Sequence, residues 1–163
     1  MIAALQSIRE EVLNEISDIP QESINERENE EKWSIGQVLD HLQRTERVVT
    51  QSVKYILTKG KECEVTDKPL EIIVDRSRKV TAPENIAPTN EPVDKLKAIT
   101  LLEESRRDLL NFLETLPEDT NLKNKAMKHP FVGDLSTQQW IEFIGYHERR
   151  HLYQLREIKE AIL

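Results

Sequence analysis

The sequence predicts an all-α protein, a four-helix bundle with a long crossover between its second and third helices. Four segments repeat apolar residues at spacings of three and four, the pattern of helices with one buried face. Glycine occurs only four times in 163 residues and aromatic residues make up 5%, a composition that favours helices over a many-turned β fold. No segment reads clearly as a strand. The length suits a single domain over residues 1–163 with a buried core.

The first two helices are predicted from their apolar faces and their end signals. The first ends at Pro20, and the polar stretch 21–32 is expected to be a loop. The second begins after Ser34, which forms a capping-box pattern with Gln37, and it closes near Gly60. The apolar faces comprise Leu5, Ile8, Val12, Ile16 and Ile19 in the first helix, and Ile35, Val38, Leu39, Leu42, Val49, Val53 and Ile56 in the second.

Residues 61–91 are the hardest segment to interpret. Pro69, Pro83 and Pro88 interrupt it, but residues 70–74 (LEIIV) are too apolar for a plain linker. We expect a long crossover that packs partly on the bundle and includes one short helix, because long structureless loops are uncommon in small domains. With such a connection, the second and third helices need not be antiparallel neighbours.

The third and fourth helices complete the predicted bundle. The third follows Pro92 and ends at Pro117, and residues 118–135 are expected to be a loop. The fourth begins at a second capping-box pattern, Ser136 with Gln139. The expected buried positions are Leu96, Ile99, Leu102, Leu109, Leu113 and Leu116 in the third helix, and Trp140, Ile144, His147, His151, Leu155, Ile158 and Ile162 in the fourth.

Charge and cysteine content narrow the class of protein. The formal net charge is −7 and basic residues are dispersed among acidic ones, which argues against nucleic acid and against an anionic membrane surface as partners. Cys63 is the single cysteine, which fits a reducing compartment. The N-terminal stretch is interrupted by charged residues at 9–11, so we expect no signal peptide. These features predict a cytoplasmic protein that acts on a small molecule.

Three histidines form the candidate metal site. His147 and His151 are four residues apart, so they share one helix face and can bind one ion. Both fall within an apolar stripe, where an imidazole requires a polar partner. That partner is a divalent metal or a hydrogen bond. His41 borders the buried face of the second helix, and three neutral imidazoles would leave an open position on the metal, as in catalytic sites.

Residues 147–151 also read HERRH and match the H-E-x-x-H pattern of zinc proteases. The chain has no further histidine after His151 and no evident substrate-aligning strand, so we discount a protease. Glu148 is nevertheless a candidate general base, and the alternative is a solvated helix charge, because adjacent helical positions do not share a face. His129 is expected to be a surface loop residue, and Cys63 a plain thiol. Thr45, Asp40 and Gln154 are candidates for orienting the imidazoles.

Several motifs together resemble the DinB/YfiT-like proteins. Residues 33–42 (WSIGQVLDHL) are similar to the start of that family's second helix. Residues 129–135 (HPFVGDL), then Trp140 and residues 147–155 (HERRHLYQL), are similar to its last loop and helix. The proline-containing segment 82–88 also fits. The resemblance implies a four-helix bundle with a long crossover, and a metal on His41, His147 and His151.

Three functions follow as alternatives. The resemblance implies an S-transferase or isomerase that uses a low-molecular-weight thiol such as bacillithiol or mycothiol, with zinc or nickel on the three histidines. The second is a metal-dependent hydrolase that uses metal-bound water with Glu148 as general base. The third is a non-enzymatic metal-binding or scaffold bundle. Dimers are common among such relatives, so a homodimer is also expected.

Overall fold

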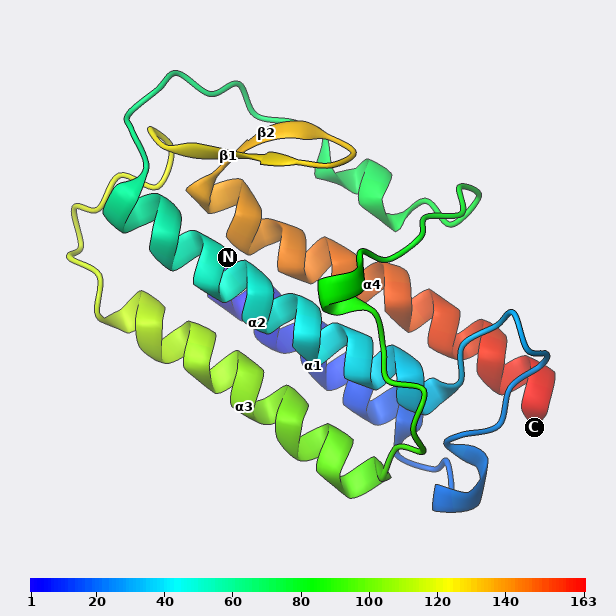
Figure 1. Cartoon of the computed structure of the whole chain (residues 1–163). Helices are drawn as coiled ribbons and strands as arrows, with labels where there is room; N and C mark the ends of the chain where they lie inside the picture. The colour runs from blue at the N-terminus through cyan, green and yellow to red at the C-terminus, as the bar shows by residue number, and fades with distance from the viewer.

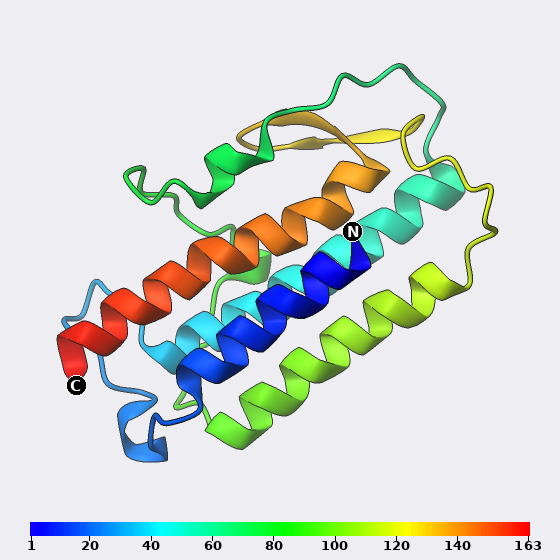
Figure 2. The ribbon, with the colours of Figure 1, turned by 180° about the vertical axis from the view of Figure 1, so that it is seen from behind.

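Four helices lie side by side in a bundle, as the computed structural model of residues 1–163 shows (Figures 1 and 2). Their bounds are Ile2–Ile16 for α1, Ile35–Lys59 for α2, Lys95–Glu114 for α3 and Thr137–Ile162 for α4. Helices α1 and α4 run in one direction and α2 and α3 in the other. Helix α2 packs on both α3 and α4, and α1 packs on α4. The predicted bundle is thereby confirmed. Helices α2 and α3 are parallel because the crossover returns the chain to the end of the bundle at which α2 begins.

The crossover contains two short 3₁₀ helices where one short helix was expected. Leu70–Val74 (η2) packs on α4, and Glu84–Ile86 (η3) packs on α2. A third, Gln21–Ser23 (η1), lies within the stretch expected to be a loop. A proline is the N-cap residue of each of these three helices. Such tight turns are too short for hydrophobic periodicity to reveal.

A β-hairpin precedes α4, so the prediction that the chain has no strand and that residues 118–135 are a plain loop was wrong. Strands β1 (Ala126–His129) and β2 (Gly133–Ser136) pair antiparallel, with His129 opposite Gly133. Gly133 has a φ of 84°, a conformation that a side chain would strain. Strands of four residues show too few alternations to be recognised from sequence.

Helix ends follow the predicted signals in part. The Ser34 hydroxyl accepts the Gln37 backbone N–H at 3.1 Å and the Gln37 side chain accepts the Ser34 N–H at 3.2 Å, so the first capping box is confirmed. Ser136 caps α4, but the Gln139 side chain bonds both backbone groups of Lys68 and fixes the crossover to α4. Helix α3 begins at Lys95 with Asp94 as its N-cap rather than directly at Pro92.

The predicted apolar faces meet in two hydrophobic clusters. The first joins α1, α2, α3 and the C-terminal half of α4, and the second joins the opposite ends of the helices with the hairpin. Leu96 is an exception, because 74% of it is exposed, so its assignment to the buried face of α3 was wrong. Six residues before the buried Leu102 correspond to about 240° of rotation, which turns Leu96 away from the core. None of the helices combines the length and hydropathy that a membrane span requires.

Candidate metal centre

The structure brings His41, His147 and His151 together inside the bundle. His41 lies on α2, and His147 and His151 lie one turn apart on α4. The Nε2 atom of His147 is 3.1 Å from Nε2 of His41 and 3.2 Å from Nε2 of His151. All three potential ligand atoms lie within 4.8 Å of one another. The predicted convergence of side chains from two distant parts of the chain is thus confirmed.

Two of these rings are oriented by hydrogen bonds from their other nitrogen. The Nδ1 atom of His41 is 2.6 Å from the carbonyl oxygen of Ile86, in η3. Since a carbonyl can only accept, this nitrogen carries the proton and the Nε2 lone pair of His41 is free. The Nδ1 atom of His151 likewise donates to Oε1 of Gln154, at 2.7 Å. Such partners commonly fix the tautomer and direction of metal-binding histidines.

The donor set fits a cation. With Nδ1 of His41 and His151 protonated, both Nε2 atoms are acceptors that point at Nε2 of His147. A single proton on His147 Nε2 can satisfy one of them at a time, which leaves lone pairs facing each other at about 3 Å. One divalent ion accepts all three lone pairs at once. Three imidazoles also leave a coordination position open.

Burial keeps these imidazoles neutral, which is the form that binds metal. His41 and His151 are 2% and 6% exposed, and His147 is half-buried. Burial lowers the pKa of His41, and it lowers the pKa values of His147 and His151 far below their usual range. The neighbouring histidines lower the pKa of His147 further, because two adjacent imidazolium charges repel.

Aromatic side chains surround the cluster. The ring of Trp33 lies 4.9 Å from that of His41 and 6.2 Å from that of His151, and the latter pair is stacked. The ring of Phe143 lies 5.3 Å from that of His147. Trp33 also packs on the first hydrophobic cluster. These rings place apolar surface against the three imidazoles.

The fourth histidine lies outside the cluster. His129 is the last residue of β1 and only 6% exposed, so the expectation of a surface loop residue was wrong. Its ring packs on Trp140 and Phe143, and its Nδ1 accepts the backbone N–H of Phe131 at 3.2 Å. The hairpin, which was not predicted, is what buries it. Cys63 is exposed.

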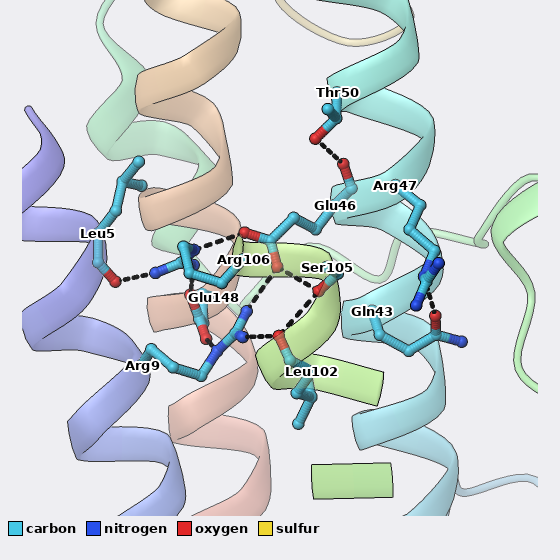
Figure 3. A network of polar contacts seen from close by, with 10 residues as sticks. All are labelled: Leu5, Arg9, Gln43, Glu46, Arg47, Thr50, Leu102, Ser105, Arg106 and Glu148. Atoms are coloured by element: carbon cyan, nitrogen blue, oxygen red, sulfur yellow. Dashed lines mark hydrogen bonds and ion pairs between the residues drawn. The ribbon is translucent and has the colours of Figure 1, made fainter. Parts of the chain in front are cut away.

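The side chain of Glu148 lies in a separate polar network (Figure 3). Its two carboxylate oxygens pair with Arg9 and with Arg106, the latter at 2.7 Å, and the residue is 1% exposed. It is therefore not the solvated charge that one alternative described. Both of its oxygens accept hydrogen bonds from guanidinium groups, one from Arg9 and one from Arg106.

Of the residues considered for orienting the imidazoles, the structure selects Gln154. Asp40 instead accepts from Arg44 at 2.8 Å and from the backbone N–H of Thr89 at 2.8 Å. The hydroxyl of Thr45 is buried and has no hydrogen-bond partner in the protein. The carbonyl of Ile86 was not anticipated, because a backbone acceptor from a distant turn leaves no signal in the side-chain sequence.

The metal-free protein should become less stable as the pH falls below about 6.5. The pKa values of the three histidines are lowered in the folded state, so the unfolded chain binds protons first and stability decreases with falling pH. Each histidine contributes at most about 1.4 kcal/mol per pH unit. Urea unfolding of the chelator-treated protein between pH 7 and 5 measures this slope. The His147→Gln/His151→Gln variant should have a shallower slope. An equal slope would show that these two histidines are not the source of the pH dependence.

The fold and the histidine cluster define a class, a helical bundle with a three-imidazole site between α2 and α4. The profile of the DinB superfamily matches residues 4–155, and the chain belongs to this family. It is 34% identical over 154 residues to the uncharacterized protein YuaE of Bacillus subtilis (strain 168), and the match covers 94% of each chain.

Two solved structures share the fold. YfiT from Bacillus subtilis, reported to have an unusual four-helix bundle topology, aligns with a TM-score of 0.64 at 14% identity, over 98% of this chain and 83% of YfiT. The four-helix bundle protein TT2238 also aligns with a TM-score of 0.64, at 17% identity, over 95% of this chain and 94% of its own. The resemblance to DinB/YfiT-like proteins is thereby confirmed.

Proposed function

We propose that this protein is a metal-dependent enzyme in which His41, His147 and His151 hold one divalent ion. The observation that carries the proposal is the convergence of three Nε2 atoms, two of them fixed as acceptors by bonds at Nδ1. Imidazole donors suit zinc and nickel among the available divalent metals. An ion held there would supply a Lewis acid that lowers the pKa of a water or thiol at its open position.

The protein's own residues would bind the ion, orient its ligands and shield the site from water. The Ile86 carbonyl and the Gln154 amide hold the rings of His41 and His151 with their Nε2 atoms directed at the site. Trp33 and Phe143 cover the imidazoles and limit water access, which strengthens electrostatic interactions within. Since both oxygens of Glu148 are bonded to arginines, we do not assign it the role of general base.

Hydrolysis of a small-molecule ester or amide is the first candidate reaction. It is supported by YfiT, which shares the fold and is described as a probable metal-dependent hydrolase. Transfer of a low-molecular-weight thiol to an electrophile is the second, and its support is the sequence resemblance together with the affinity of thiolates for zinc. Both reactions use the same three histidines and differ in the nucleophile that completes the site.

A substrate panel with and without added thiol separates these reactions. The metal-loaded protein is incubated with activated esters, amides and thiol-reactive electrophiles, each in the presence and absence of bacillithiol. Metal-dependent turnover without thiol supports hydrolysis, and turnover that requires the thiol supports transfer. His147→Ala should abolish either activity. Turnover that survives in this variant would show that the three histidines do not carry the reaction. A wild-type protein that takes up no stoichiometric metal would instead favour a non-enzymatic bundle.

A further inference from the structure

Four buried charges, one from each helix, form a network beside the histidine cluster. Arg9 comes from α1, Glu46 from α2, Arg106 from α3 and Glu148 from α4, and none is more than 6% exposed. The Glu46 carboxylate accepts hydrogen bonds from Arg9 Nη2 at 2.7 Å and from Arg106 Nε at 2.5 Å. The Glu148 carboxylate is bound by the same two arginines. Figure 3 shows both guanidinium groups between the two carboxylates.

Neutral groups satisfy the rest of this network. The Ser105 hydroxyl donates to Glu46 at 2.6 Å, Arg9 donates to the carbonyl of Leu102, and Arg106 donates to the carbonyl of Leu5. The two positive and two negative charges balance. Buried ion pairs are weak contributors to net stability, because apolar residues of similar volume often serve as well. What these directional contacts supply instead is a fixed relation between four helices.

The network lies beside the histidines on the same two helices. Glu148 follows His147 directly on α4, a rotation of about 100°. Glu46 follows His41 by five residues on α2, a rotation of about 140° and a rise of about 7.5 Å. Each ligand-bearing helix is therefore anchored by a carboxylate to the same pair of arginines. Rotation or sliding of either helix would break several of these bonds and separate the Nε2 atoms.

We propose that Glu46 and Glu148 are positioning residues for the metal site, and that the two arginines lock α2 and α4 in the rotation and register that bring three Nε2 atoms to one point. This inference rests on the proposed function, since it assumes that the cluster binds metal. In this proposal Glu148 acts by holding His147 in place on α4, not by transferring a proton.

The test compares metal affinity and site geometry in matched variants. Glu148→Gln removes one charge at constant shape, and Arg106→Gln/Glu148→Gln removes one charge of each sign, so the network stays neutral. Ile16→Ala is the control, because Ile16 is fully buried in α1, which carries no ligand. Zinc affinity is measured by competition with a chromophoric chelator, and the visible absorption of the Co²⁺-loaded proteins reports coordination geometry.

Both network variants should bind zinc about 10–100-fold more weakly than the wild type, as is usual when a partner that orients metal ligands is lost. Their Co²⁺ spectra should also shift, a change that loss of stability alone would not produce. Ile16→Ala should be destabilised but keep the wild-type affinity and spectrum. Should both network variants fail to fold, Ser105→Ala, which keeps all four charges, should show a smaller change in the same direction.

The possible failures are distinguishable. If the wild type binds zinc through the histidines and the folded network variants match its affinity and spectrum, the positioning role is overturned and the metal site stands. An unchanged Ser105→Ala, in the case where only that variant folds, has the same meaning. If the wild type takes up no zinc, or His147→Ala binds it equally well, the proposed function fails and this inference fails with it.

Discussion

Replacing His147 by alanine should eliminate stoichiometric metal binding. His147 is the central member of the cluster, since its Nε2 lies within 3.2 Å of the Nε2 atoms of both His41 and His151. Its loss leaves one ligand nitrogen on α2 and one on α4, and it removes the pair of ligands one turn apart on α4. We expect affinity to fall by more than the roughly 100-fold that marks the upper range for loss of an outer partner. Elemental analysis of tag-free protein after gel filtration measures the result directly.

His129→Ala is the matched control for this measurement. His129 is also a buried histidine packed on Phe143, but its nitrogens do not belong to the three-imidazole cluster. The control should retain about one ion per chain, the content that we also expect of the wild type. Equal metal content in the His147→Ala and wild-type proteins would show that any bound ion lies elsewhere.

Replacing Arg106 by alanine should produce a large loss of stability. The substitution leaves the carboxylates of Glu46 and Glu148 buried with Arg9 as their only cationic partner. Burial alone raises the pKa of Glu46, but the charges of Arg9 and Arg106 and the Ser105 hydroxyl hold it below its usual value. We expect a loss of about 3–5 kcal/mol in the free energy of unfolding at pH 7, the range for breaking a buried pair.

The adjacent Arg107 provides the control. It has the same side chain on the same helix but is exposed and forms no ion pair. Arg107→Ala should change the free energy of unfolding by no more than about 0.5 kcal/mol. Urea denaturation followed by circular dichroism gives both values. A loss below about 1 kcal/mol in Arg106→Ala would contradict a tightly coupled buried network.

Helix α4 shows how far local sequence patterns reach. The repeat of apolar residues predicted its buried face, and the spacing of four between His147 and His151 predicted that they share it. The same pattern did not reveal that Glu148 is buried, because the sequence of one helix does not show which other helices pack against each of its faces. Only the approach of α1 and α3 brings Arg9 and Arg106 to it.

The hairpin and crossover show where such patterns stop. Strands of four residues and 3₁₀ turns of three to five residues are too short for a period to be seen, so the hairpin that buries His129 was missed. The Ile86 carbonyl that orients His41 is a backbone group, and its direction depends on how the crossover packs on α2.

By itself the sequence determined the four helices, their apolar faces, one complete capping box and the identity of the three histidines, because each depends on residues within a few turns of one another. The tertiary structure alone decided that helices α2 and α3 run parallel, that the three Nε2 atoms meet, and that two arginines join Glu46 to Glu148. These features depend on contacts between residues some 40 to 140 positions apart, whose geometry is set by packing of the whole bundle.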